Sequence, residues 1–211
     1  MKSHLYPFTP LYLPYSFNAL EPFISKDALQ LNYEYYYKNN IDKLNNLIKS
    51  YPTLKIYTLE EGLFNQMILP SFLRKEYLFY AGGIYNYELF FENLSLYPKI
   101  LPHGNFKEAI RKKFGNFDTL LNQLIALSKS VNNYSYLLVV STQNKNIHIM
   151  GTKDNDTSVP FNLCPLIVIN ICEHMYFTDY KEDLTQYIKN IFSCVNFDVV
   201  ESRYNNCFYN N

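Results

Sequence analysis

The stretch from Leu166 to Tyr180, LIVINICEHMYFTDY, decides the expected fold of the second half of the chain. Residues 165–172 are apolar apart from Asn170, and so they predict a strand that is buried on both faces and central in its sheet. Glu173 and His174 follow directly, and such a pair at the end of a buried strand is typical of a metal or proton-transfer site. The chain has only four histidines, so few imidazoles are available to complete a metal site.

Two further strands and three helices are expected around this strand. Residues 134–142, YSYLLVVST, and 145–152, KNIHIMGT, are short apolar runs separated by a polar turn, which predicts a β-hairpin. Helices are expected at residues 105–114 and 116–131, each with an asparagine placed as N-cap, and a closing helix at 179–195.

The first half of the chain predicts a pair of long helices. Ser25 is placed to cap a helix over residues 26–48, which Pro52 stops. Its apolar residues keep a spacing of three to four, namely Ala28, Leu31, Tyr35, Ile41, Leu44 and Ile48. A short helix is expected at residues 58–64. A second long helix follows at 76–96, with Gly82 and Gly83 where another segment can approach closely.

These elements predict an α+β fold in two parts. Pro98 and Pro102 interrupt the pattern, and we place the boundary there. The expected units are an N-terminal helical hairpin domain, residues 1–100, and a C-terminal α/β domain, residues 101–211.

The composition argues against several classes of protein. The formal net charge is zero, whereas proteins that bind nucleic acid through phosphates carry a basic surplus. No apolar run approaches the ~20 residues that a membrane span requires. The cysteines lack metal-like spacing, and Cys164, Cys172 and Cys194 lie in apolar runs, so we expect buried thiols rather than a disulfide framework. The first 20 residues contain no acid and no arginine, which gives weak support to a mitochondrial transit peptide, with part of the fold as the alternative.

Four stretches, in the same order along the chain, resemble the iron/manganese superoxide dismutases. They are LPYSFNALEPFISKDAL at residues 13–29, AGGIYNYELFFENLSL at 81–96, FGNFDTL at 114–120, and the segment 173–204. The resemblance covers nearly the whole chain. It implies an N-terminal helical hairpin packed on a C-terminal α/β domain with a three-stranded antiparallel sheet, in agreement with the pattern of the residues.

The resemblance also implies an iron or manganese ion held by three histidines and one aspartate. The first-helix histidine falls on Asn32, the second-helix histidine on Tyr87 and the aspartate on Asn170, so that His174 alone is kept. Amide oxygens and a neutral phenol are poor ligands beside imidazole and carboxylate. We therefore expect no bound metal, with Fe or Mn as the ion if one is bound, and the Tyr87 hydroxyl in its place.

Residues around the expected site are changed as well. The hydrogen-bonding tyrosine of the family falls on Asn40, a nearby histidine on Tyr36, and the glutamine of the manganese enzymes on Asn155. Within the tryptophan-containing aromatic wall, Tyr134 and Tyr136 are the corresponding residues.

A dimer interface is implied at Glu173, His174, Tyr36 and Phe177. In the family this glutamate reaches the ligand histidine of the other subunit, and the alternative is a pair satisfied within one chain. The expected partner is a second copy or another dismutase-like chain.

The loss of ligands predicts a catalytically inactive pseudoenzyme that serves as a structural or assembly subunit. The expected place is the mitochondrial small ribosomal subunit, with protein partners, little direct RNA contact, and no membrane. Two alternatives stay open: an active or partly active Fe/Mn superoxide dismutase, and a ligand- or partner-binding protein of this fold outside the ribosome. The expected location is mitochondrial, or otherwise cytoplasmic.

Overall fold

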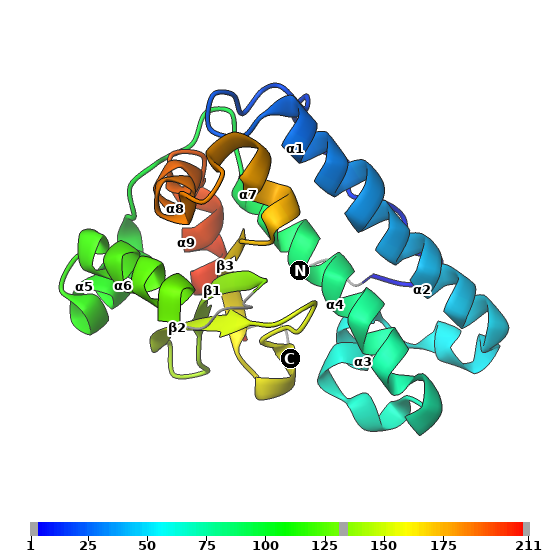
Figure 1. The fold of residues 1–211 in the computed structure, drawn as a ribbon. Coiled ribbons are helices and arrows are strands. Elements are labelled where there is room, and N and C mark those ends of the chain that lie inside the picture. Colours follow the sequence, from blue (N-terminus) through cyan, green and yellow to red (C-terminus); the bar gives the residue numbers. More distant parts are fainter. Residues whose placement is uncertain (1–3, 131–134, 209–211) are drawn as a thin grey trace.

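A helical hairpin lies beside a smaller sheet that is covered by further helices (Figure 1). The structure is a computed structural model that describes residues 4–130 and 135–208. The hairpin half contains α1 (Lys26–Leu31), a π-helical segment (Asn32–Tyr37), α2 (Lys38–Ser50), α3 (Leu59–Phe64) and α4 (Ser71–Asn93). The second half contains α5 (Gly104–Phe114), α6 (Phe117–Ser130), β1 (Tyr136–Ser141), β2 (Ile147–Thr152), β3 (Cys164–Asn170), α7 (Glu173–Tyr180), α8 (Leu184–Phe192) and α9 (Phe197–Asn206). The predicted α+β class is confirmed.

The first hairpin helix is not a regular α-helix. Ser25 caps it as predicted, accepting a hydrogen bond from the backbone N–H of Ala28. The helical winding then widens to a π-helix at residues 32–37, which shifts the side chains that follow relative to a 3.6-residue period. Leu31 and Tyr35, predicted on the buried face, are 42% and 63% exposed instead. That part of the prediction is wrong because the π-helical insertion moves the buried face onto other residues.

Helix α4 is the central element of the hairpin half. All residues from Ala81 to Phe91 are buried, and the helix contacts both α2 and β3. Gly82 permits the predicted close approach, because a Cβ there would collide with the backbone carbonyl of Asn155. The helix begins at Ser71, five residues before the predicted start, and ends at Asn93, three residues before the predicted end.

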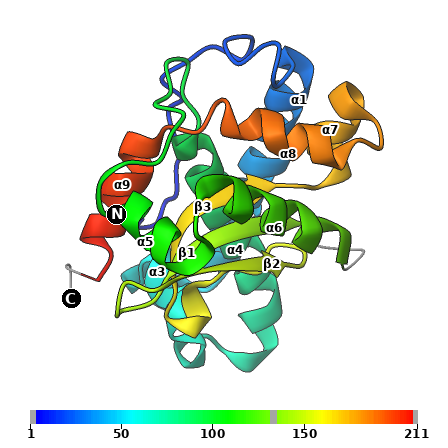
Figure 2. The ribbon, with the colours of Figure 1, turned by 90° about the vertical axis from the view of Figure 1, so that its left-hand side faces the viewer.

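The sheet is antiparallel throughout, with the order β2-β1-β3. The predicted hairpin of β1 and β2 is confirmed, and α5 and α6 pack near β2 (Figure 2). The central strand is β1, so the prediction that β3 is central is wrong. Every residue of β3 is nevertheless buried. Val131 and Tyr134, at the ends of a predicted helix and strand, lie outside the described residues.

The outer edge of β3 is covered by side chains rather than by a strand. The carboxamide of Asn93 donates to the Leu166 carbonyl at 3.2 Å and accepts from the Val168 N–H at 3.2 Å. Arg203 Nη1 also donates to the Leu166 carbonyl, at 2.9 Å. An edge strand whose backbone groups are paired in this way can be as apolar as a central one, which explains the misleading sequence pattern.

The end of the chain differs from the predicted single helix. Helix α7 ends at Tyr180, the following residue Lys181 has a φ of 53°, and α8 starts only at Leu184. A further helix, α9, was not predicted. Cys164 forms a disulfide with Cys207, so the expectation of a buried thiol at Cys164 is wrong, whereas Cys172 and Cys194 are free.

The segment before α1 belongs to the fold from His4 onward. Phe8 is 5% exposed, and its backbone N–H and C=O both pair with the Asn45 carboxamide at 2.9 Å. The Tyr15 hydroxyl donates to the Phe91 carbonyl of α4. The described residues of this segment therefore pack as part of the fold, whereas the transit peptide stays a prediction. The domain boundary at residue 100 stays a prediction.

We predict that Asn93→Ala destabilises the protein by about 1–3 kcal/mol, because the buried Val168 N–H loses its partner and the Leu166 carbonyl loses one of its two donors. Urea unfolding measures the change. Asn46→Ala on the exposed side of α2 is the matched control, expected within about 0.5 kcal/mol of the parent. Equal stability of the two variants would contradict the role of Asn93.

Candidate functional site

The predicted site positions converge between the hairpin and the sheet. Asn32 lies at the start of the π-helical segment, Tyr87 within α4, Asn170 at the end of β3 and His174 in the first turn of α7. Cys172 and Glu173 carry the chain from the strand into α7, and this short turn places His174 against Asn32. The structure therefore brings together residues from four elements.

Asn32 is the centre of this cluster and is fully buried. Its Nδ2 donates to the Ala28 carbonyl at 2.8 Å and to the His174 carbonyl at 3.1 Å. Its Oδ1 accepts from the Tyr87 hydroxyl at 2.9 Å and lies 2.9 Å from His174 Nδ1. Two donors and two acceptor positions are thus all used, which is the full capacity of a carboxamide.

The imidazole of His174 is neutral in this arrangement. Because the Asn32 oxygen can only accept, His174 Nδ1 carries the proton and donates it. Burial lowers the pKa of His174 to about 4, so the ring stays uncharged at neutral pH. Tyr36 stacks on the ring, with centroids 3.7 Å apart and planes 15° apart. The free lone pair is therefore on Nε2, the nitrogen that does not face Asn32.

Tyr87 fills the space that faces Asn32. It is 2% exposed, and its ring lies against Phe91 at 5.6 Å, Tyr37 at 6.1 Å and Tyr136 at 6.2 Å between centroids. Burial raises the pKa of Tyr87 well above its ordinary value, so it remains a neutral phenol. The Tyr87 hydroxyl donates a hydrogen bond to Asn32, and His174 also bonds to Asn32 rather than to Tyr87.

Asn170 turns its amide nitrogen toward this space. Its Oδ1 accepts from the Cys172 N–H at 2.9 Å, which fixes the orientation of the carboxamide. Its Nδ2 is buried and has no hydrogen-bond partner among the described residues. It lies near the Tyr87 hydroxyl, where it lowers the pKa of Tyr87 against the larger, opposing effect of burial. A donor group thus occupies the position where the family has a carboxylate.

These residues do not fit the family's metal ion. A centre for Fe or Mn requires several lone pairs that converge on one point, with an anion among them. The cluster offers one uncharged imidazole whose Nδ1 is a donor, a neutral phenol that is a donor, and an amide N–H₂ group. Within residues 4–130 and 135–208, no group of three or more His, Cys, Asp or Glu side chains is placed to hold a metal.

Asn40 and Asn155, which fall on the family's outer tyrosine and glutamine, also come together. Both carboxamides lie close to Gly83 of α4, where a Cβ would collide with them. Asn155 is held there by a hydrogen bond from its Nδ2 to the Phe79 carbonyl at 2.9 Å. The two positions are therefore neighbours in space.

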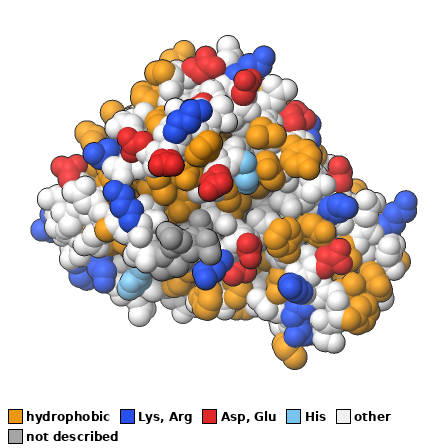
Figure 3. All heavy atoms as spheres, viewed as in Figure 1, with side chains coloured by type: hydrophobic (Ala, Val, Ile, Leu, Met, Phe, Trp, Pro, Cys, Tyr) orange, Lys and Arg blue, Asp and Glu red, His pale blue; other side chains and the backbone are white. Residues whose placement is uncertain are grey.

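The predicted interface residues share one face of the molecule. Apolar side chains and a histidine gather where α7 meets the first hairpin helix (Figure 3). Phe177 is 46% exposed, Tyr36 is half-buried and Glu173 is exposed. In the described part of the chain, the Glu173 carboxylate has no hydrogen bond or ion pair, so the pair within one chain is not formed. The interface itself stays a prediction.

One cluster was missed by the sequence reasoning. His4 lies between two carboxylates, at 2.7 Å from Glu60 and 2.7 Å from Glu88. The signal was available in the sequence, because Glu88 is the only charged residue between Glu76 and Glu92 in an otherwise apolar and aromatic helix.

Sequence comparisons identify the class of protein that this fold and pocket define. The profile for the alpha-hairpin domain of iron/manganese superoxide dismutases matches residues 7–95, and the profile for their C-terminal domain matches residues 102–203. The chain belongs to the iron/manganese superoxide dismutase family.

Individual relatives match along nearly their whole length. The manganese superoxide dismutase of Listeria monocytogenes is 27% identical over 192 residues, 91% of this chain and 95% of the relative. Superoxide dismutase [Mn] 2 of Bacillus anthracis is 29% identical over 194 residues, 91% and 92% of the two chains. The manganese enzyme of Thermus aquaticus is 27% identical over 199 residues, 94% and 98%.

These relatives correct the functional prediction. They are named as manganese superoxide dismutases, so the comparisons support the enzyme alternative, and the prediction of an inactive structural subunit of the mitochondrial ribosome is wrong. The expectation of no cofactor is likewise unsupported, because the family implies iron or manganese. Among the described residues, no helix is long and apolar enough to cross a membrane.

We predict that Tyr87→Phe destabilises the protein by about 0.5–1.5 kcal/mol, because the buried Asn32 oxygen loses one of its two donors and keeps only His174. Denaturant unfolding measures the loss. Tyr35→Phe removes a hydroxyl from a side chain that is 63% exposed, and it is expected to leave stability unchanged. If both variants unfold like the parent, the Tyr87–Asn32 bond does not stabilise the pocket.

Proposed function

We propose that the chain is a superoxide dismutase of the iron/manganese class, with superoxide as its substrate. The observation that carries the proposal is the full-length match to proteins named as manganese superoxide dismutases, with both domains in the same order. The pocket between hairpin and sheet supports it, because it holds His174 at the matching position.

The donor set of the pocket limits what can be derived about the reaction. Asn32, Tyr87 and Asn170 replace three of the family's four ligands, and they do not fit the ion as arranged here. We therefore derive no step at a metal.

The first experiment is a joint measurement of metal content and superoxide consumption. The protein is purified natively after growth with added Mn and Fe, and bound metal is counted by mass spectrometry. The proposal requires near-stoichiometric Mn or Fe and superoxide consumption, both lost in His174→Ala. His148→Ala, an exposed histidine on β2, is the control that should keep both.

The opposite outcome is equally clear. Less than about a tenth of an equivalent of either metal, together with no superoxide consumption, overturns the proposal. Metal that survives His174→Ala would place the ion elsewhere on the chain.

We further propose that the chain works as a dimer through the face formed by Tyr36, Glu173, His174 and Phe177. The partner is a second copy or another dismutase-like chain. Support comes from the unpaired carboxylate of Glu173 beside an exposed phenylalanine, since an interface supplies a partner for the first and covers the second.

Sedimentation velocity tests this dimer. The parent is expected to sediment as twice 25.0 kDa. Phe177→Asp should weaken association by about tenfold or more, because it places a charge in the centre of the interface. Phe64→Asp, at a side chain of α3 that is 57% exposed, should not. A monomeric parent, or equal effects of both variants, would remove this face as the interface.

A further inference from the structure

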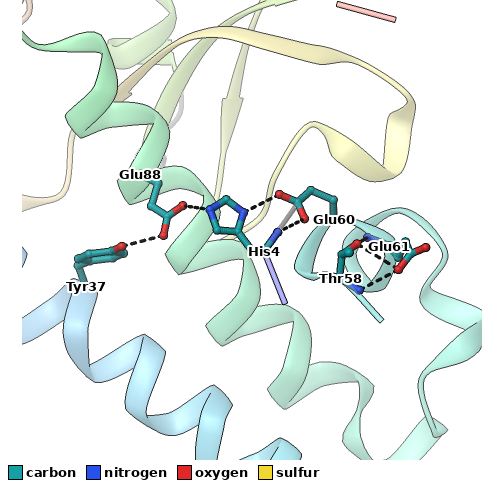
Figure 4. A network of polar contacts seen from close by, with 6 residues as sticks. All are labelled: His4, Tyr37, Thr58, Glu60, Glu61 and Glu88. Atoms are coloured by element: carbon teal, nitrogen blue, oxygen red, sulfur yellow. Dashed lines mark hydrogen bonds and ion pairs between the residues drawn. The ribbon is translucent and has the colours of Figure 1, made fainter. Parts of the chain in front are cut away.

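Helix α4 carries a carboxylate that is almost completely buried. The Glu88 side chain is 7% exposed. Its Oε1 accepts from the Tyr37 hydroxyl at 2.7 Å, and its Oε2 lies 2.7 Å from His4 Nε2 (Figure 4). A buried carboxylate without a counter-charge is strongly destabilising, so Glu88 depends on a cation. His4 is the cation that the structure provides.

His4 is held from both sides of its ring. Nδ1 lies 2.7 Å from Glu60 Oε1 in α3, while Nε2 faces Glu88 in α4, so the ring joins the two helices (Figure 4). Hydrogen bonds to Glu60 and then to Glu88 raise the pKa of His4 to about 10, against the opposing effect of burial. The backbone of His4 adds a third tie, because its carbonyl accepts from the Leu59 N–H at 2.9 Å.

The residues after His4 follow the hairpin and are fixed by side chains of it. Asn45 of α2 clamps the backbone of Phe8, as described above. The Leu11 N–H donates to the Tyr37 hydroxyl at 2.7 Å, and the Leu11 carbonyl accepts from Tyr33. Tyr37 therefore joins Leu11 to Glu88, and its ring lies 6.1 Å from that of Tyr87.

We infer that residues 4–15 form a latch that closes on α3 and α4, with the imidazolium of His4 as the counter-charge that allows Glu88 to be buried. The latch goes beyond the proposed dismutase function and does not depend on it. Opening it would leave Glu88 unpaired and would remove the Leu11 support from Tyr37, which lies against the wall of the Tyr87 pocket.

Other titratable groups face this cluster and bear on its pH dependence. On α4, Tyr77 and Tyr85 are buried, and their pKa values are raised by burial first and by Glu60 second. On the first hairpin helix, burial and then Glu88 raise the pKa of Tyr37. All three stay neutral across the range in which His4 titrates, so His4 is the group whose charge changes there.

The test is a double-mutant cycle on the full chain with His4→Gln, Glu88→Gln and the combined variant. His4→Gln keeps a polar side chain but removes the charge, and we expect Tm to fall by about 5 °C or more. Adding Glu88→Gln removes the uncompensated carboxylate, so the double variant should regain at least half of that loss. Arg111→Gln, which breaks the exposed pair with Glu108, is the control and should leave Tm within about 2 °C.

Two readouts distinguish a latch from ordinary packing. Hydrogen exchange at the Leu11 and Leu59 amides should accelerate at least about tenfold in His4→Gln and much less in the Arg111 control. The second readout is the free energy of unfolding measured across pH. The raised pKa of His4 means that its contribution is complete below 6.5, the ordinary histidine value, and is lost as pH rises toward about 10. Parent stability should therefore fall over this range more steeply than that of Glu88→Gln.

The outcomes decide the inference. A double variant no more stable than His4→Gln, or unchanged exchange at Leu11 and Leu59, overturns the latch. If His4→Gln does not fold, the comparison of the parent with Glu88→Gln across pH still decides. Equal pH profiles for those two proteins refute it. Metal content and superoxide consumption play no part in this test.

Discussion

The structure depends on one constraint: α4 is buried along most of its length, so each polar side chain on it must find a partner inside the protein. Each one recruits a different segment. Asn86 donates to the Asp156 carbonyl after β2, Tyr87 to Asn32 of the first hairpin helix, and Asn93 to the edge of β3. Glu88 requires a charge and takes it from the start of the chain. The helix thereby specifies four of its neighbours, which apolar contacts alone leave degenerate.

Much of the fold could be predicted from the residues, because the buried strand predicted at residues 165–172 and two long amphipathic helices have few ways to pack. The errors have local physical causes. The exposure of Leu31 and Tyr35 follows from a π-helical insertion, which no 3.6-residue pattern reveals. The edge position of β3 was hidden because Asn93 pairs its backbone as a strand would. The disulfide of Cys164 and Cys207 joins residues 43 apart, and apolar surroundings gave no sign of it.

The pocket was predictable only through the family resemblance, which aligned four distant positions that the fold then brought together. What alignment could not give was the direction of each donor. The Cys172 N–H takes the oxygen of Asn170 and so turns its amide nitrogen inward, and two backbone carbonyls take the nitrogen of Asn32 and so turn its oxygen inward. Similarity over the whole chain reports on the many residues that build the hairpin and sheet, whereas the donor set rests on four. The whole-chain similarity and the donor set therefore agree about the fold and differ only about the metal site.

Two adjacent residues of α4 face different clusters. Tyr87 faces the uncharged cluster with Asn32, and Glu88 faces the charged cluster with His4. Successive helical residues point about 100° apart, so Tyr87 faces the pocket while Glu88 faces the segment before α1. A bare carboxylate so close to the pocket would act on every titratable group in it through a poorly screened interior. The imidazolium of His4 cancels that field at 2.7 Å, and the second carboxylate, Glu60, lies on the more exposed side, with 27% of its side chain accessible. His174 and Tyr87 stay uncharged because they are buried, and the first residues of the chain supply the opposite charge that the neighbouring Glu88 requires.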